Sequence, residues 1–163
     1  DLFNEEGHIG ADLAVVGMKN WRRDAWFDDT GLMWVNPSPN MRNLIAATLY
    51  PGVGMIEYGN VSVGRGTDQP FEQIGAPWID GAALARRLGG FGLPGVAFRP
   101  VTYRPTFQKH AGIDCGGVQL HVTDREAFRP ILTTLALLGV VRDRCGGRGY
   151  GDESRARSAR RGE

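Results

Sequence analysis

The sequence has few of the residues that build metal sites and disulfide frameworks. Only 2 of its 163 residues are cysteines, Cys115 and Cys145, and they form no C-x-x-C pair. Disulfide-rich small domains and zinc ribbons need several cysteines at short spacing. The 3 histidines lack the H-E-x-x-H spacing of zinc hydrolases. We therefore expect neither a metal nor a cofactor, and we interpret Cys115 as a buried packing residue.

Long apolar runs are also absent. The chain opens on the acidic segment 1–6, and no apolar stretch with the length of a signal peptide or a membrane span follows. We expect no membrane-spanning segment. Because the sequence begins without Met, in what reads as the end of a helix, we expect a piece of a longer protein.

A strong charge of either sign is missing as well. Lys and Arg number 19 against 18 for Asp and Glu, so the net charge of +1 gives no general attraction to nucleic acid. Residues 142–163 differ, with seven Arg, four acidic residues and no apolar periodicity. This composition is typical of a disordered segment. We favour a truncated end or an altered reading frame over a nucleic-acid-binding tail.

The apolar pattern of the first half predicts alternating strands and helices, and so an α/β fold. Residues 11–18, with Asp12 ahead of the apolar run Leu13-Ala14-Val15-Val16, are typical of a buried strand in a parallel sheet. Asn40 can cap a helix over residues 41–49, which Pro51 would end. Residues 55–58 predict another short strand, directly before a glycine-bearing loop.

The second half predicts a small sheet between two helices. Asp80 can cap a helix that runs to about Leu88. Residues 96–101 and 118–122 are predicted strands that we expect to pair. A helix over residues 125–138 is predicted to follow a cap at Thr123 or Asp124. The residues of this last helix that we expect in the core are Phe128, Ile131, Leu132, Leu135 and Leu138.

Polar side chains gather among glycines in residues 57–78. They are Glu57, Asn60, Arg65, Thr67, Asp68 and Glu72. This mixture suits a polar ligand with many hydroxyl groups, because glycines let backbone N–H groups approach a ligand closely. The loop is neither a Walker A motif nor a dinucleotide fingerprint, so a phosphate site is weakly supported.

Two carboxylates in this segment are available for acid or base chemistry. Glycoside hydrolysis typically uses a pair of carboxylates roughly 5 to 9 Å apart. Glu57 and Glu72 are the candidates, although their separation along the chain fixes no distance in space. A glutamate beside an arginine is also commonly a structural ion pair. His121, inside an alternating strand, is interpreted as structural rather than as a general base.

Several motifs in a fixed order resemble a known family. The motifs are Trp34-Val35-Asn36-Pro37-Ser38-Pro39-Asn40-Met41, Leu49-Tyr50-Pro51-Gly52, Ser62-Val63-Gly64-Arg65-Gly66-Thr67, Pro70-Phe71-Glu72, Gly75-Ala76-Pro77-Trp78-Ile79-Asp80 and the segment Cys115 to Asp124. Together they are similar to the NamZ-type exo-β-N-acetylmuramidases. The resemblance covers about residues 1–138.

The resemblance implies a fold and an activity. It implies a secreted or periplasmic glycosidase that releases N-acetylmuramic acid from the non-reducing end of peptidoglycan fragments. The expected fold is the end of a Rossmann-like domain over residues 1–76, followed by part of a smaller α+β auxiliary domain over residues 77–141 and by the basic tail, residues 142–163. The active site would lie in the cleft between the domains.

The resemblance also implies roles for individual residues. Glu57 and Glu72 are the expected catalytic groups. The expected substrate binders are Asn40, Asn60, Arg65 and Thr67. Arg65 suits the lactyl carboxylate of muramic acid, because its planar guanidinium can donate two parallel hydrogen bonds. The expected partners are peptidoglycan-derived sugars, without nucleic acid; the oligomeric state stays open.

Two departures from the family pattern keep an alternative open. The family carries a Glu-His-Gly motif upstream of the segment that this chain matches, and that motif would be a leading source of catalytic groups. Where the family commonly has Glu-Gly-Thr-Asn, this chain has Glu57-Tyr58-Gly59-Asn60. The alternative function is a non-catalytic module that binds cell-wall sugars or another protein.

Overall fold

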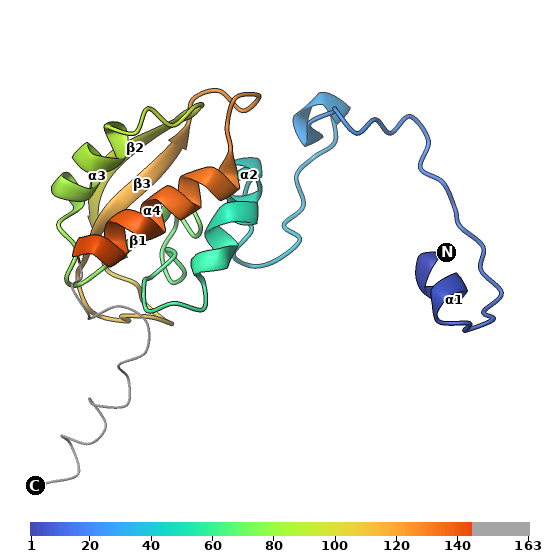
Figure 1. The fold of residues 1–163 in the computed structure, drawn as a ribbon, viewed down its shortest axis with the longest axis horizontal. Helices are drawn as coiled ribbons and strands as arrows, with labels where there is room; N and C mark the ends of the chain where they lie inside the picture. Colours follow the sequence, from blue (N-terminus) through green and yellow to red (C-terminus); the bar gives the residue numbers. More distant parts are fainter. Residues whose placement is uncertain (145–163) are drawn as a thin grey trace, which may run out of the picture. The chain divides into compact units, whose positions relative to one another are not determined.

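The computed structural model describes residues 1–144 and divides the chain into two units, Asp1–Met33 and the part from Trp34 onward (Figure 1). The first unit holds a short helix, α1 (Leu2–Glu6), and a 3-10 helix, η1 (Phe27–Thr30). Among the described helices, none combines the length and the apolar character that a membrane crossing needs.

The predicted strand at residues 11–18 is wrong. This segment has no regular secondary structure, and Val15 and Val16 are 73% and 94% exposed. A parallel strand forms only when neighbouring strands complete its hydrogen bonds and helices cover both of its faces. No described strand pairs with residues 11–18. The apolar run therefore finds no partner within the described part of the chain.

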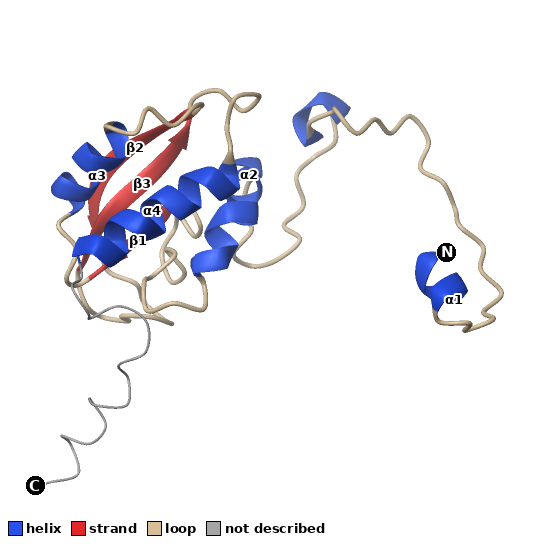
Figure 2. Cartoon of the chain, viewed as in Figure 1, coloured by secondary structure: helices blue, strands red, loops and turns tan. Residues whose placement is uncertain are grey.

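The second unit is a three-stranded antiparallel sheet with helices packed over one face (Figure 2). Its strands are β1 (Gln73–Ala76), β2 (Val96–Tyr103) and β3 (Cys115–Val122), in the spatial order β1-β3-β2. Its helices are α2 (Leu44–Val53), α3 (Gly81–Gly89) and α4 (Pro130–Arg144). The predicted pairing of residues 96–101 with 118–122 is confirmed.

The register of the sheet separates an apolar face from a polar row. Phe98 lies opposite Leu120; Leu120 belongs to the core that the helices cover, and the partly buried Phe98 packs against it. On the other face, Gln73 of β1 lies opposite Gln119 of β3, which in turn lies opposite Arg99 of β2. Successive residues of a strand point to opposite faces, so this polar row crosses the sheet on the side away from the core.

Helix α2 begins and ends later than the sequence predicts. Asn43, not Asn40, is its N-cap, with Oδ1 accepting a hydrogen bond from the backbone N–H of Ala46 at 2.7 Å. The helix continues through Pro51 to Val53.

Helix α2 packs closely against α4 just after Pro51. A Cβ atom at Gly52 would lie 2.2 Å from the backbone oxygen of Pro130 in α4, so glycine lets the two helices touch. The 3-10 helix η2 (Gly54–Ile56) then follows directly, and the strand predicted at residues 55–58 is wrong.

Helix α4 begins at Pro130 rather than Arg125, because Asp124 Oδ1 accepts hydrogen bonds from Glu126 and Ala127 in a separate turn. Its core face also differs from the predicted one. Phe128 is buried, as predicted, but it precedes the helix. The buried residues of α4 are Thr133, Thr134, Leu137 and Val140, whereas Ile131, Leu132 and Leu135 are exposed.

The remaining predictions have mixed outcomes. Asp80 caps α3 as predicted, accepting from the N–H of Ala83 at 3.0 Å. Cys115 is fully buried, as predicted, and burial raises the pKa of its thiol.

The predicted boundary after Ala76 falls inside the second unit, between β1 and α3, which share one core. The predicted tail starts within α4, and its residues 145–163 lie outside the described part of the chain.

Candidate active site

A tight turn at residues 64–67 presents Arg65. The backbone N–H of Thr67 donates to the carbonyl of Gly64 at 3.2 Å, and the Thr67 hydroxyl donates to the same oxygen at 2.7 Å. Gly66 has φ +85°, and a Cβ atom there would lie 2.6 Å from the backbone oxygen of Phe107. Only glycine meets both demands without strain. The sequence Gly-Arg-Gly-Thr therefore fixes Arg65 at the tip of the turn.

The segment before this turn is held along the edge of the sheet. Ser62 and Gly75 of β1 exchange two backbone hydrogen bonds, at 2.8 and 3.0 Å. The Tyr103 hydroxyl donates to the Ser62 carbonyl at 3.2 Å. These hydrogen bonds attach the segment before the turn to the sheet.

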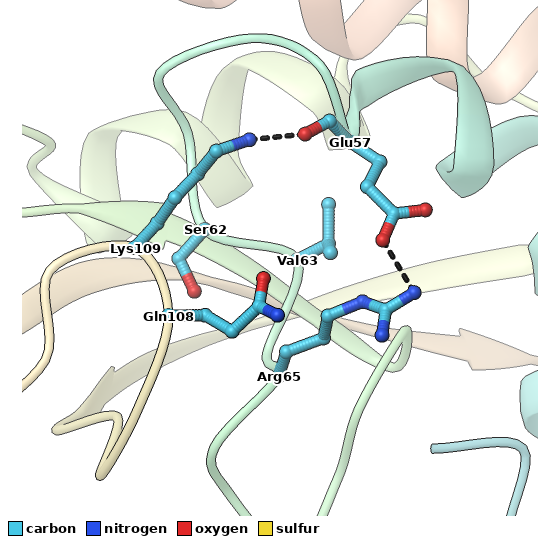
Figure 3. Close-up of a pocket in the computed structure, with 6 residues that line it drawn as sticks. All are labelled: Glu57, Ser62, Val63, Arg65, Gln108 and Lys109. Atoms are coloured by element: carbon cyan, nitrogen blue, oxygen red, sulfur yellow. Dashed lines mark hydrogen bonds and ion pairs between the residues drawn. The ribbon is translucent and has the colours of Figure 1, made fainter. Parts of the chain in front are cut away.

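The guanidinium group of Arg65 is oriented by two neighbours. It forms an ion pair with the Glu57 carboxylate (Figure 3). Its Cζ lies 5.1 Å from the centre of the Phe71 ring. The side chains of Arg65 and Glu57 remain about a quarter exposed, at 23% and 25%. Arg65 Nε is buried without a hydrogen-bond partner among the described residues. The group is therefore held in place and retains unused donors.

A second loop, residues 105–112, is hydrogen-bonded to the segment 57–66 that carries Arg65. Thr106 N–H donates to the Gly66 carbonyl at 2.8 Å, and Lys109 Nζ donates to the Glu57 carbonyl. His110 Nε2 lies 2.7 Å from the Asn60 carbonyl oxygen. Sequence reasoning missed these contacts, because they join positions about fifty residues apart and no local pattern marks them.

The side chains of both loops enclose a small pocket (Figure 3). Its lining residues are Glu57, Ser62, Val63, Arg65, Gln108 and Lys109. Its volume is about 10 Å³, which has room for the centre of about one water molecule. A sugar ring does not fit inside. A ligand would instead contact the exposed edge of the Glu57–Arg65 pair.

A larger groove lies on the other side of the same turn. It has a volume of about 660 Å³. Gly66 and Thr67, the residues after Arg65, form part of its wall. Arg99 and Gln73, from the polar row of the sheet, form another part. The turn thus separates the small pocket from the groove.

The six site residues that the sequence predicted lie in different surroundings in the structure. Glu57 and Arg65 are together, and Thr67 lines the groove. Glu72 is buried, and its Oε1 accepts a hydrogen bond from Asn43 Nδ2 at 2.7 Å. Asn60, beside Glu57 in the chain, and Asn40, before α2, line neither the pocket nor the groove.

Among the described residues, no group of three or more His, Cys, Asp or Glu side chains gathers in a way that could hold a metal ion. The chemistry available at this site is that of hydrogen bonds and charge: a guanidinium, a carboxylate and the amide of Gln108.

Two family models and a curated protein match this chain, and they agree with one another. The family described as Exo-beta-N-acetylmuramidase NamZ, C-terminal, matches residues 48–148, and the corresponding N-terminal family matches residues 1–45. The chain is 50% identical over 142 residues to the peptidoglycan beta-N-acetylmuramidase NamZ of Bacillus subtilis (strain 168). That match covers 87% of this chain and 34% of the relative.

A solved structure is also similar. The crystal structure of a DUF1343 family protein from Bacteroides fragilis NCTC 9343 shares 31% identity at a TM-score of 0.76, over 88% of this chain and 39% of that one. The chain therefore spans about a third of the length of the curated relative and less than half of the solved one.

Proposed function

Because the chain belongs to the exo-β-N-acetylmuramidase NamZ family, we propose that it is part of a glycosidase acting on peptidoglycan fragments. The proposed reaction releases N-acetylmuramic acid from the non-reducing end. The observation that carries this proposal is the arginine held at the surface by Glu57 and Phe71. Muramic acid differs from glucosamine by a lactyl ether with a carboxylate, and a fixed guanidinium is the group that recognises a carboxylate most specifically.

The Arg65 guanidinium has donors left for that carboxylate. Its ion pair with Glu57 engages Nη2, and arginine has five N–H donors in total. The buried Nε has no access to a ligand at the surface, so the donors available to it belong to the two terminal nitrogens. We propose that the lactyl carboxylate binds along the exposed edge of Arg65. Glu57 then lies beside the sugar, where its carboxylate can stabilise developing positive charge or exchange a proton.

Glu72 receives a different role in this proposal. Its carboxylate is buried and already accepts a hydrogen bond from Asn43, the residue that caps α2. We therefore propose that Glu72 positions the loop rather than acts on the glycosidic bond. Asn60 would act through its backbone, since its carbonyl oxygen contacts His110.

The larger protein is also part of the proposal. We propose a Rossmann-like domain followed by a smaller α+β domain, with the junction ahead of α2, close to where the two family matches meet. Residues 49–74 share a core with α3 and α4, which supports a junction ahead of them. Because peptidoglycan lies outside the cytoplasm, we propose a secreted or periplasmic location.

A non-catalytic sugar-binding module is the second candidate. It is favoured by one observation: Glu57 is paired with Arg65 and Glu72 is bound by Asn43. Neither arrangement provides the free carboxylate pair that glycoside hydrolysis typically uses. Such a module would bind muramic acid without releasing it from a glycan.

One experiment tests both candidates on the chain itself. Isothermal titration measures binding of N-acetylmuramic acid and of N-acetylglucosamine to the wild type, to Arg65→Ala and to the control Arg86→Ala, an exposed arginine of α3. We expect Arg65→Ala to weaken muramic acid binding about tenfold or more, the scale of a hydrogen bond to a charged group, and to leave glucosamine binding nearly unchanged. Equal losses for both sugars would overturn the role of Arg65.

Catalysis is tested in the same samples. The chain is incubated with the disaccharide of N-acetylmuramic acid and N-acetylglucosamine, and the free monosaccharides are measured by mass spectrometry. Release of N-acetylmuramic acid supports the glycosidase. Specific binding of the disaccharide without release shows that this part of the protein binds the sugar and does not suffice for catalysis.

A further inference from the structure

The groove beside the Arg65 turn lies on the face of the sheet away from the core. Two members of the polar row that crosses the sheet, Gln73 and Arg99, line it, and the buried Gln119 lies between them in the row. Gln73 Nε2 donates to Thr67 Oγ1 at 2.8 Å, and Arg99 Nε donates to Gln119 Oε1 at 3.1 Å. The row is therefore held by hydrogen bonds within the protein, and the buried Gln119 fixes the position of its exposed member, Arg99.

The size of the groove suits a ligand of one or more sugar rings. Ligand sites in proteins have volumes of roughly 300 to 1,000 Å³. The groove, at about 660 Å³, falls in this range, whereas the pocket beside Arg65 does not. Phe107, 49% exposed at the groove wall, offers an aromatic surface of the kind that packs against the apolar face of a sugar.

The charge of the groove is positive. Arg42, Arg99 and Arg104 line it, with Asp68 as the acidic lining residue. Arg104 is neutralised, because both of its hydrogen bonds to the Asp114 carboxylate are 2.7 Å long. Arg99 differs, because its side-chain partner is the uncharged amide of Gln119. A guanidinium whose charge is not balanced by a neighbouring carboxylate is available to an anionic ligand.

We propose that this groove is a second subsite, which binds the glycan beyond the terminal sugar and recognises the carboxylate of the next muramic acid through Arg99 and Arg42. The inference rests on the proposed function. In glycan from which the stem peptides have been removed, muramic acid alternates with glucosamine, so a free lactyl carboxylate recurs on every second ring. A glycan whose first muramic acid meets Arg65 continues across the turn, where Gly66 and Thr67 begin the groove wall.

The test compares ligands that differ in length and charge. Isothermal titration of the full chain uses the disaccharide, the tetrasaccharide with two lactyl carboxylates, and a tetrasaccharide whose second lactyl carboxylate is a methyl ester. We expect the tetrasaccharide to bind roughly fivefold more tightly than the disaccharide, the upper scale of an exposed ion pair. The methyl ester should lose that gain.

Variants assign the gain to the groove. Arg99→Gln and Arg42→Gln should each reduce the advantage of the tetrasaccharide and leave disaccharide binding unchanged, while the control Arg86→Gln should change neither. Circular dichroism checks that each variant is folded. A wild-type chain that binds disaccharide, tetrasaccharide and methyl ester equally well overturns the inference, whatever the variants do.

The two proposals fail in different ways. If the disaccharide binds through Arg65 but length and esterification have no effect, the groove inference fails and the proposed function stands. If neither N-acetylmuramic acid nor the disaccharide binds, while N-acetylglucosamine does, the proposed function fails.

Discussion

The side chain of Asn43 bonds at once to the start of α2 and to the Glu72 carboxylate. Its Oδ1 accepts from the Ala46 N–H at 2.7 Å, and its Nδ2 donates to Glu72 Oε1, also at 2.7 Å. Glu72 in turn precedes β1 and follows Phe71, the residue whose ring lies under Arg65. One amide therefore connects the N-terminus of a helix to the loop that orients the candidate site.

Removal of this amide should destabilise the protein. Asn43→Ala deletes an N-cap, worth about 1 kcal/mol, and leaves a buried carboxylate oxygen without its donor, worth a further ~1–3 kcal/mol. Urea unfolding should therefore show a loss of about 2–4 kcal/mol. Asn43→Ser should lose less stability, because serine can still cap the helix. Serine is too short to reach Glu72, so only the hydrogen bond to that carboxylate is lost.

Asn40 provides the matched control for that measurement. The sequence suggested Asn40 as the cap, but it lies ahead of the helix that Asn43 caps. Asn40→Ala should change the free energy of unfolding by no more than about 0.5 kcal/mol. A loss at Asn40 equal to that at Asn43 would contradict the observed cap.

The turn that presents Arg65 should not tolerate a larger residue than glycine. Gly66→Ala places a methyl group 2.6 Å from the Phe107 backbone oxygen, at a φ of +85°. We expect a destabilisation of ~1–3 kcal/mol, the range for a strained backbone residue, together with weaker muramic acid binding. The control is Gly89→Ala in α3, where a Cβ atom meets no atom within 4 Å. That variant should be neutral or more stable.

The elements that sequence patterns predicted correctly are those with strong local signals. Two such elements are helix α3, which Asp80 caps, and strand β3, which the alternation in residues 118–122 predicted. Their formation depends mainly on neighbouring residues in the chain. Residues 11–18 and helix α4 depend on distant partners instead. An apolar run becomes a strand only beside other strands, and the buried face of α4 is decided by its packing against α2 and α3.

The candidate site shows the same division. Glu57 and Arg65, eight positions apart in a glycine-bearing loop, could be singled out from the sequence, and the structure pairs them. The contributions of Lys109 and Gln108 could not be predicted, because the loop that carries them reaches the site only through the folded sheet. The same holds for the polar row under the groove, whose members come from three strands.

Alkaline pH should destabilise the protein through two buried acids. Burial raises the pKa of the Tyr103 hydroxyl and of the Cys115 thiol above their ordinary values. The unfolded chain therefore releases these protons first, so stability falls as pH rises above about 9, the ordinary range of a thiol. The measurement is the loss of unfolding free energy between pH 7.5 and pH 10. This loss should be smaller in Cys115→Ala and in Tyr103→Phe than in the wild type. An unchanged difference in both variants would contradict this assignment.

The two faces of α4 should respond differently to the same truncation. Leu137 is fully buried in the core, whereas Leu135 is 53% exposed. Leu137→Ala removes buried methyl groups and should destabilise by about 2–5 kcal/mol, while Leu135→Ala on the surface should lose much less, about 0.5 kcal/mol. Both variants keep a residue of high helix propensity, so the difference reports burial rather than helix formation. If urea unfolding gave the opposite order, Leu135 would belong to the core, as the apolar spacing of the sequence suggested, and the orientation of α4 described above would be wrong.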